Sequence, residues 1–83
     1  MLYYMYMKKY NVTYIVYFKN SIKNIDTVVI AKNKDEAKKI ADTKLDKYLS
    51  KREIDGYELE SVEEYNTRDH SADLNKFVEY MPA

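Results

Sequence analysis

The stretch that most restricts the fold is residues 10–19, YNVTYIVYFK, in which aromatic and β-branched side chains recur at alternate positions. Such alternation is typical of a β-strand, because successive side chains point to opposite faces of a sheet. One parity carries Tyr10, Val12, Tyr14, Val16 and Phe18, and the other carries Asn11, Thr13, Ile15, Tyr17 and Lys19. Because both parities contain apolar side chains, both faces of the resulting sheet need cover.

A second β-rich run follows at hairpin distance. The polar segment KNSIKN, residues 19–24, precedes IDTVVIAK, residues 25–32. A short polar connection between two such runs predicts an antiparallel hairpin. If Val29 and Ala31 face a covering helix, Val28 points to the other face of the sheet.

The segment NKDEAKKIADTKLDKYLSKR, residues 33–52, predicts a helix. Asn33 is a favourable N-cap, and Glu36 completes a capping box three residues later. Lys51 and Arg52 stand at the C-terminal end, where the helix dipole favours positive charge. Apolar side chains recur at the three- and four-residue spacing of one helical face. They are Ala37, Ile40, Ala41, Leu45, Tyr48 and Leu49.

The segment YELESVEEY, residues 57–65, predicts a third strand after an Asp-Gly turn signal. Leu59 and Val62 fall on opposite parities, so a regular strand would send them to opposite faces of the sheet. We therefore expect a β-bulge near Glu60 or Ser61.

The remaining residues predict a tail that ends in a short helix. Four apolar side chains lie at helical spacing, namely Leu74, Phe77, Val78 and Met81. Ser71 can cap such a helix, and Pro82 follows its end.

The order strand, strand, helix, strand predicts an α+β fold with a three-stranded antiparallel sheet of order 2-1-3. The main helix covers one face, and the short C-terminal helix covers part of the other. We expect one domain over residues 1–83, with residues 1–7 as a flexible extension, a β-β-α-β core over 10–65 and a tail over 66–83. Any apolar surface left bare on the second face indicates a partner surface.

Three runs, YNVTYIVYF, TVVIAKNKDEAKKIA and YELESVEEY, together resemble the small β-β-α-β proteins of bacteriophages and mobile elements, including DpnD/PcfM-like domains. The chain is also similar in scale to anti-CRISPR inhibitors. The resemblance covers residues 10–65 and implies the fold and an anti-defence inhibitor function. It implies no functional residues, because the shared pattern concerns packing and helix capping.

Charge is distributed unevenly along a chain whose formal net charge is zero. Residues 1–52 carry a net charge of +7, and residues 53–83 carry −7. One interpretation is that these charges are simply solvated, with the lysine-rich helix lying near the acidic strand and tail. A second is that the acidic part binds a basic site on a host protein that handles nucleic acid. Its candidate residues are Tyr57, Glu58, Glu60, Glu63, Glu64, Tyr65, Asp69 and Asp73, with Glu79 as a further acidic member.

Two alternatives remain open. A nucleic-acid-binding module would use a lysine-rich helix to hold phosphates and a sheet tyrosine to stack on bases. Its candidate residues are Lys38, Lys39, Lys44, Lys47, Lys51, Arg52 and Tyr17. We consider nucleic acid the less favoured partner, because the acidic third of the chain would repel a polyanion. A homodimer would instead join two copies through the first strand or the uncovered sheet face.

The sequence offers little for catalysis, and we interpret the chain as a non-enzyme without cofactor or metal. His70 is the only histidine and lies beside Asp69 in a segment expected to be a loop. The chain has no cysteine and one glycine, so it lacks thiolate ligands and glycine-rich phosphate loops.

The opening run, MLYYMYMKK, predicts neither a secretory leader nor a membrane span. Its lysines follow the apolar residues instead of preceding them. Charged residues also interrupt every window of about 20 residues, the length that a membrane span needs. We therefore expect a cytoplasmic protein of a bacterial host cell without membrane contact.

Overall fold

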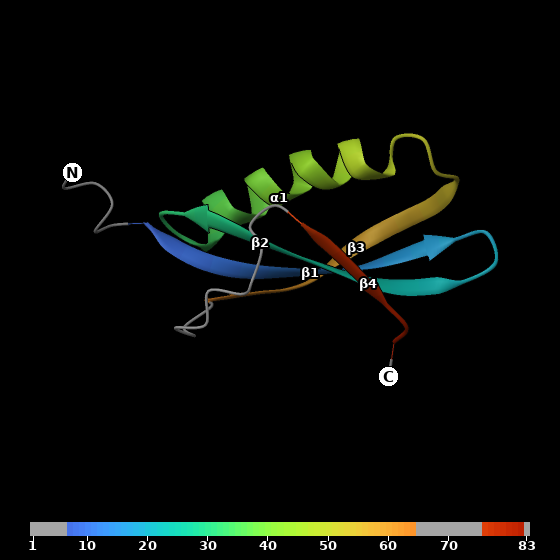
Figure 1. The fold of residues 1–83 in the computed structure, drawn as a ribbon, viewed down its shortest axis with the longest axis horizontal. Helices are drawn as coiled ribbons and strands as arrows, with labels where there is room; N and C mark the ends of the chain where they lie inside the picture. The colour runs from blue at the N-terminus through green and yellow to red at the C-terminus, as the bar shows by residue number, and fades with distance from the viewer. Residues whose placement is uncertain (1–6, 65–75, 83) are drawn as a thin grey trace.

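The computed structural model describes residues 7–64 and 76–82. Within them an antiparallel sheet of four strands, in the order β3-β1-β2-β4, carries one helix on one face (Figure 1). The elements are β1 (Lys8–Phe18), β2 (Ile22–Ala31), α1 (Lys34–Leu49), β3 (Ile54–Glu64) and β4 (Phe77–Tyr80). The α+β class and the neighbours of β1 are as predicted, but the predicted three-stranded sheet is wrong because β4 adds a fourth strand.

β1 and β2 form the predicted antiparallel hairpin. Tyr10 lies opposite Val29, and Tyr17 lies opposite Ile22. The Phe18 N–H donates to the Ser21 carbonyl oxygen at 2.8 Å, which closes the turn. This tight closure lets β2 begin at Ile22, three residues before the start that composition indicates.

The helix begins as its capping signals predict. The Asn33 side-chain oxygen accepts a hydrogen bond from the Glu36 N–H at 2.9 Å. The Glu36 carboxylate accepts one from the Lys32 N–H at 2.9 Å, one residue before the position used in a standard capping box. Two donors at the start of α1 are thereby satisfied.

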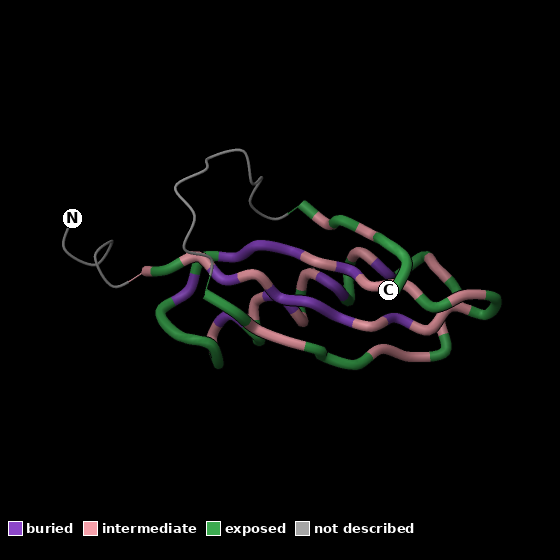
Figure 2. The backbone as a smooth tube through the Cα atoms, turned by 90° about the horizontal axis from the view of Figure 1, so that it is seen from below, coloured by how far each residue is buried: buried purple, intermediate pink, exposed green. Residues whose placement is uncertain are grey.

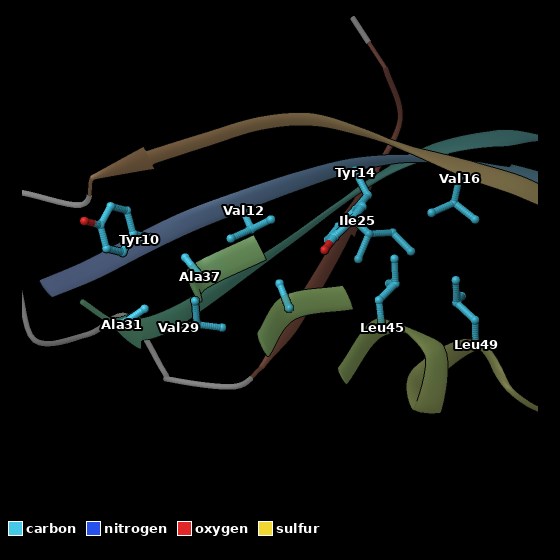
Figure 3. Packing of buried hydrophobic residues seen from close by; sticks show 11 residues of the cluster. Tyr10, Val12, Tyr14, Val16, Ile25, Val29, Ala31, Ala37, Leu45 and Leu49 are labelled. Carbon is cyan, nitrogen blue, oxygen red and sulfur yellow. The ribbon is translucent and has the colours of Figure 1, made fainter. Parts of the chain in front are cut away.

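The core lies between α1 and the two central strands. Buried residues run along β1 and β2, whereas β3 and β4 are half-buried or exposed (Figure 2). Figure 3 shows the helix side chains directed at the sheet. Alanines on α1 leave room for the larger sheet side chains. The cluster comprises Tyr10, Val12, Tyr14, Val16, Ile25, Val29, Ala31, Ala37, Ala41, Leu45 and Leu49.

The predicted bulge in β3 is confirmed. Thr13 of β1 lies opposite Ser61 and Tyr14 lies opposite Leu59, so Glu60 has no partner in the ladder. The extra residue places Leu59 and Val62 on the same face although their parities differ. That face is the one covered by α1, since Val62 lies opposite the buried Val12.

A second irregularity in β3 depends on glycine. Tyr17 lies opposite Gly56 and Phe18 lies opposite Ile54, so Asp55 is skipped. The φ angle of Gly56 is 151°, a value that residues with a Cβ rarely adopt.

A Gly56→Ala variant is expected to lower the free energy of unfolding by about 1 kcal/mol. The cause is backbone strain, because an added Cβ would meet no atom within 4 Å. Urea denaturation measures the change, and Ser61→Ala on the same strand is the control. An unchanged midpoint for Gly56→Ala would show that the strand relaxes without strain.

The predicted C-terminal helix is wrong, because Phe77–Tyr80 forms the edge strand β4. β4 pairs with β2, with Phe77 opposite Thr27 and Tyr80 opposite Asn24. The sequence FVEY is rich in aromatic and β-branched residues, and the edge of β2 supplies the backbone partners that a short strand needs. Leu74 and Ser71, which also supported the helix, lie outside the described residues.

Candidate functional site

Four of the acidic residues predicted to bind a partner lie on β3, at an edge of the sheet. β3 pairs only with β1 among the described strands. Glu58, Glu60, Glu63 and Glu64 are all exposed on it. Tyr65, Asp69 and Asp73, predicted for the same surface, lie outside the described residues, as does His70.

The four glutamates differ in their partners. Glu64 forms an ion pair with Lys8 at 3.3 Å. Glu58 accepts a hydrogen bond from the Tyr17 hydroxyl at 3.3 Å. Neither Glu60 nor Glu63 forms an ion pair with another residue of 7–64 or 76–82. Within the described residues, the edge therefore keeps two carboxylates without an ion pair.

Tyrosines and carboxylates meet on the sheet face opposite α1, which we call the open face. The Tyr80 hydroxyl donates to Asp26 at 3.0 Å. The pKa of Tyr80 is raised by burial first, then by Asp26, with a smaller contribution from the charge of Glu60. On the same face, Tyr17 has a raised pKa because of the charge of Glu58. Asp26 and Tyr80 thus extend the acidic surface beyond the predicted residues.

Sequence reasoning did not select Asp26, although a signal was present. Asp26 shares its strand parity with Val28, which was assigned to the face away from the helix. The pairing of Asp26 with Thr13 places both on the open face.

Tyr57, predicted for the acidic surface, faces the helix instead. Its hydroxyl donates to Asp46 of α1 at 2.7 Å. Its ring meets the Tyr14 ring edge-on, with centroids 5.7 Å apart. The hydrogen bond with Asp46 and burial raise the pKa of Tyr57 to about 12.

The Tyr14 hydroxyl makes a matching contact deeper under α1. It donates to Asp42 at 2.5 Å, and Asp42 also forms an ion pair with Lys38 at 2.9 Å. Burial, followed by the hydrogen bond with Asp42, raises the pKa of Tyr14 well above its ordinary value. Two sheet tyrosines thus fix the rotation of α1 through carboxylates one helical turn apart.

Glu79 lies away from the acidic edge, because β4 and β3 are the opposite edges of the sheet. The two terminal nitrogens of the Arg52 guanidinium donate hydrogen bonds to the two carboxylate oxygens of Glu79, with N···O distances of 2.5 and 3.3 Å. Lys23 lies 3.5 Å from it, and the Tyr48 hydroxyl also donates to it. The bond with Arg52, supported by Tyr48 and Lys23, lowers the pKa of Glu79 to about 2.

Aromatic rings complete this contact between β4 and the end of the helix. Tyr48 stacks on Phe77 with centroids 4.3 Å apart. The Arg52 guanidinium lies 4.6 Å from the centroid of Phe18. The stacking of Tyr48 on Phe77 joins β4 to α1, and the contact of Arg52 with Phe18 adds β1 to the same cluster.

The predicted phosphate-binding residues do not form one surface. Lys38 pairs with Asp42 and Arg52 pairs with Glu79, so both charges are compensated. Tyr17 lies on the open face, whereas the lysines project from α1 on the other side of the sheet. A shallow depression on α1 gathers three of the predicted cations beside Ile40 and Thr43. They are Lys39, Lys44 and Lys47.

The described residues contain no group of three histidine, cysteine or acidic side chains placed to hold a metal ion. Likewise, no helix within residues 7–64 and 76–82 is long and apolar enough to cross a membrane. Comparison of the chain with protein-family models, curated proteins and solved structures finds no match.

Proposed function

We propose that this chain is a small non-catalytic binding protein whose acidic edge and open face engage a basic surface of a partner protein. The observation that carries the proposal is the row of exposed carboxylates on β3. Glu60 and Glu63 of this row have no ion pair within the described part of the chain. Unpaired surface charge of one sign steers a partner of opposite charge and selects against like charge.

Tyr17 and Tyr80 support this proposal because they lie among the carboxylates of the open face. Tyrosine supplies a large contact area with few rotatable bonds, so little side-chain entropy is lost on binding. The hydroxyls are already oriented by Glu58 and Asp26. The open face is therefore organised before a partner arrives.

The partner class that fits best is a host protein that handles nucleic acid, since such proteins carry basic grooves for phosphates. Occupying that groove would block it sterically and electrostatically. The resemblance to phage and mobile-element inhibitors agrees with this role, and we propose that the protein acts in the cytoplasm of a bacterial host.

A variant that replaces Glu58, Glu60 and Glu63 by lysine is expected to lose at least tenfold of its affinity for such a partner, because attraction becomes repulsion. Immobilised protein is incubated with nuclease-treated bacterial lysate. Captured proteins are then tested for nucleic-acid binding and for displacement by DNA.

The matched control reverses three lysines of α1, Lys39, Lys44 and Lys47, and is expected to retain the partner. Equal retention by wild type and the glutamate-to-lysine variant would overturn the proposal. So would captured proteins that DNA does not displace.

A second candidate function is nucleic-acid binding through the depression on α1. The observation in its favour is that Lys39, Lys44 and Lys47 form no ion pair with another described residue. They also lie on the far side of the sheet from Glu58 and Glu63, which weakens the repulsion of a polyanion. A gel shift at physiological salt that is lost in the lysine-reversal variant would favour this candidate over the inhibitor.

Self-association is a third candidate, favoured by apolar side chains exposed near β4. Ile22, Val78, Tyr80 and Met81 expose 45, 56, 41 and 67% of their surface. Exposed apolar residues gathered in this way are typical of contact surfaces. Light scattering across a range of concentrations tests it, and a strict monomer would remove this candidate.

A further inference from the structure

β3, which ends the sheet among the described strands, is long for an edge strand. β3 has 11 residues, with ladder irregularities at Asp55 and Glu60, whereas strands of 5–6 residues are the most common. Among the described residues, no strand pairs with its outer edge. Natural proteins usually shorten or shield such edges, because unpaired backbone N–H and C=O groups recruit other strands.

The exposed carboxylates of β3 shield its outer edge, and their effect depends on the charge of the strand that approaches. If β3 of a second copy paired with it, carboxylates of the two strands would face each other, and like charges across a ladder are destabilising. A strand that carries lysine or arginine meets no such repulsion. The charge of the edge thus disfavours pairing with a second copy and favours pairing with basic segments.

The two faces of β3 specify the pattern of such a segment. Glu58 and Glu63 project on the open face, opposite Ile15 and Asn11 of β1. On the helix-covered face, Leu59 exposes 37% of its surface. An added strand alternates its side chains between these faces. It therefore needs basic residues at one parity and apolar residues at the other.

We propose that β3 takes up an extended, basic segment of a partner protein as a fifth strand of the sheet. Its lysine or arginine side chains lie over Glu58 and Glu63, and its apolar side chains lie beside Leu59. Backbone hydrogen bonds supply affinity and side-chain alternation supplies selectivity, as in other cases of strand addition. This inference rests on the proposed function and specifies how the acidic edge is used.

The test uses an eight-residue peptide that alternates lysine and valine, with both ends blocked and a fluorescent label. Fluorescence anisotropy measures its affinity for the full chain. Two further peptides each carry two N-methyl groups, either on the adjacent central residues or on the two end residues. Central methylation removes amide donors on both peptide edges, whereas terminal methylation leaves the central ladder intact.

Central methylation is expected to weaken binding at least tenfold, and terminal methylation less than twofold. A peptide with four lysines followed by four valines is expected to bind at least tenfold more weakly, because its charge is unchanged but its alternation is lost. Amide chemical shifts should change along β3 and not along β4.

Equal affinities for the centrally and terminally methylated peptides would overturn strand addition, as would failure of the alternating peptide to bind. Either result leaves the proposed function standing if the glutamate-to-lysine variant still loses its partner from lysate. If the alternating peptide does not bind and the glutamate-to-lysine variant still captures its partner, both strand addition and the proposed function are overturned.

Discussion

An Asp42→Ala variant is expected to lose about 2 kcal/mol of unfolding free energy, because it leaves the buried Tyr14 hydroxyl without an acceptor. Tyr14 has no exposed surface, and its hydroxyl donates to Asp42 at 2.5 Å. In the unfolded chain, water accepts a hydrogen bond from the Tyr14 hydroxyl. In the folded variant the hydroxyl is buried and has neither Asp42 nor water as an acceptor, so folding costs free energy. Urea denaturation followed by circular dichroism measures the change.

Asp46→Ala is the matched control on the same helix. Asp46 accepts a hydrogen bond from Tyr57, but this contact is exposed, so water can replace the carboxylate. We expect a loss of about 0.5 kcal/mol there, near the low end for a hydrogen bond. Equal losses for the two aspartates would show that the burial of the Tyr14 hydroxyl adds nothing to the cost of removing Asp42.

A Tyr14→Phe variant separates the contribution of the hydroxyl group to stability from that of the aromatic ring. This change removes the donor and leaves Asp42 with its ion pair to Lys38 at the helix surface. The expected loss is about 1 kcal/mol, smaller than that of Asp42→Ala, because no buried polar group is left unpaired. A larger loss for Tyr14→Phe would show that the carboxylate, and not the hydroxyl, is the poorly solvated partner.

Glu79→Ala is expected to lower the free energy of unfolding by about 2 kcal/mol and to loosen β4. The change removes the carboxylate that joins β4 to Arg52 and Lys23. We discount the loss expected for a fully buried pair, because Arg52 and Lys23 side chains are each 35% exposed. Amide hydrogen exchange should accelerate in β4 more than in β1.

Glu79 also gives the stability a dependence on acid. Its pKa is about 2 in the folded chain, below its ordinary value of 4.5. A carboxyl group with a lowered pKa contributes its full stabilisation above the ordinary value and loses it as the pH falls through the folded value. The contribution should therefore decline between about pH 4.5 and 2.

Glu79→Gln tests this dependence, because glutamine keeps the shape and cannot titrate. The difference in unfolding free energy between wild type and this variant should shrink as the pH falls over that range. A difference that does not vary with pH would mean that Arg52 and Lys23 do not hold the charge of Glu79.

Local signals in the sequence predicted most of the fold correctly. Asn33 caps the helix as predicted, and Glu36 reaches back to Lys32, one residue before the expected donor, because helix capping involves neighbours within one turn. The bulge at Glu60 follows from two apolar residues that had to share one face. Helix capping depends on residues close in sequence, and the bulge depends on the burial of two apolar side chains on one face, so a local pattern is enough to predict each of them.

Local sequence signals could not predict that Phe77–Tyr80 forms a strand. Phe77 and Val78 fit a helical spacing as well as a strand alternation, and four residues are too few to separate the two periods. The outcome depends on β2, about fifty positions earlier in the chain, which offers a free edge. Long-range pairing therefore overrides the local pattern here.

For the candidate site as well, the sequence predicted some residues correctly and others not. Charge alone located Glu58 and Glu63 on one strand, and the structure leaves both exposed. Charge alone also grouped Glu79 with them, although the order of the strands separates β4 from β3. Tyr57 was misplaced for a related reason, since its orientation depends on the two irregular positions in β3.

The central position of β1 has a consequence for synthesis on the ribosome. β1 is the first strand to emerge, and β2 and α1 can join it through contacts close in sequence. Its second neighbour, β3, is complete only when Glu64 has been made. Until then a strand rich in tyrosine and valine keeps one open edge in the nascent chain, where it is exposed to misassembly. β3 closes that edge last, through its backbone ladder with β1, and its exposed carboxylates then lie on an outer strand of the sheet.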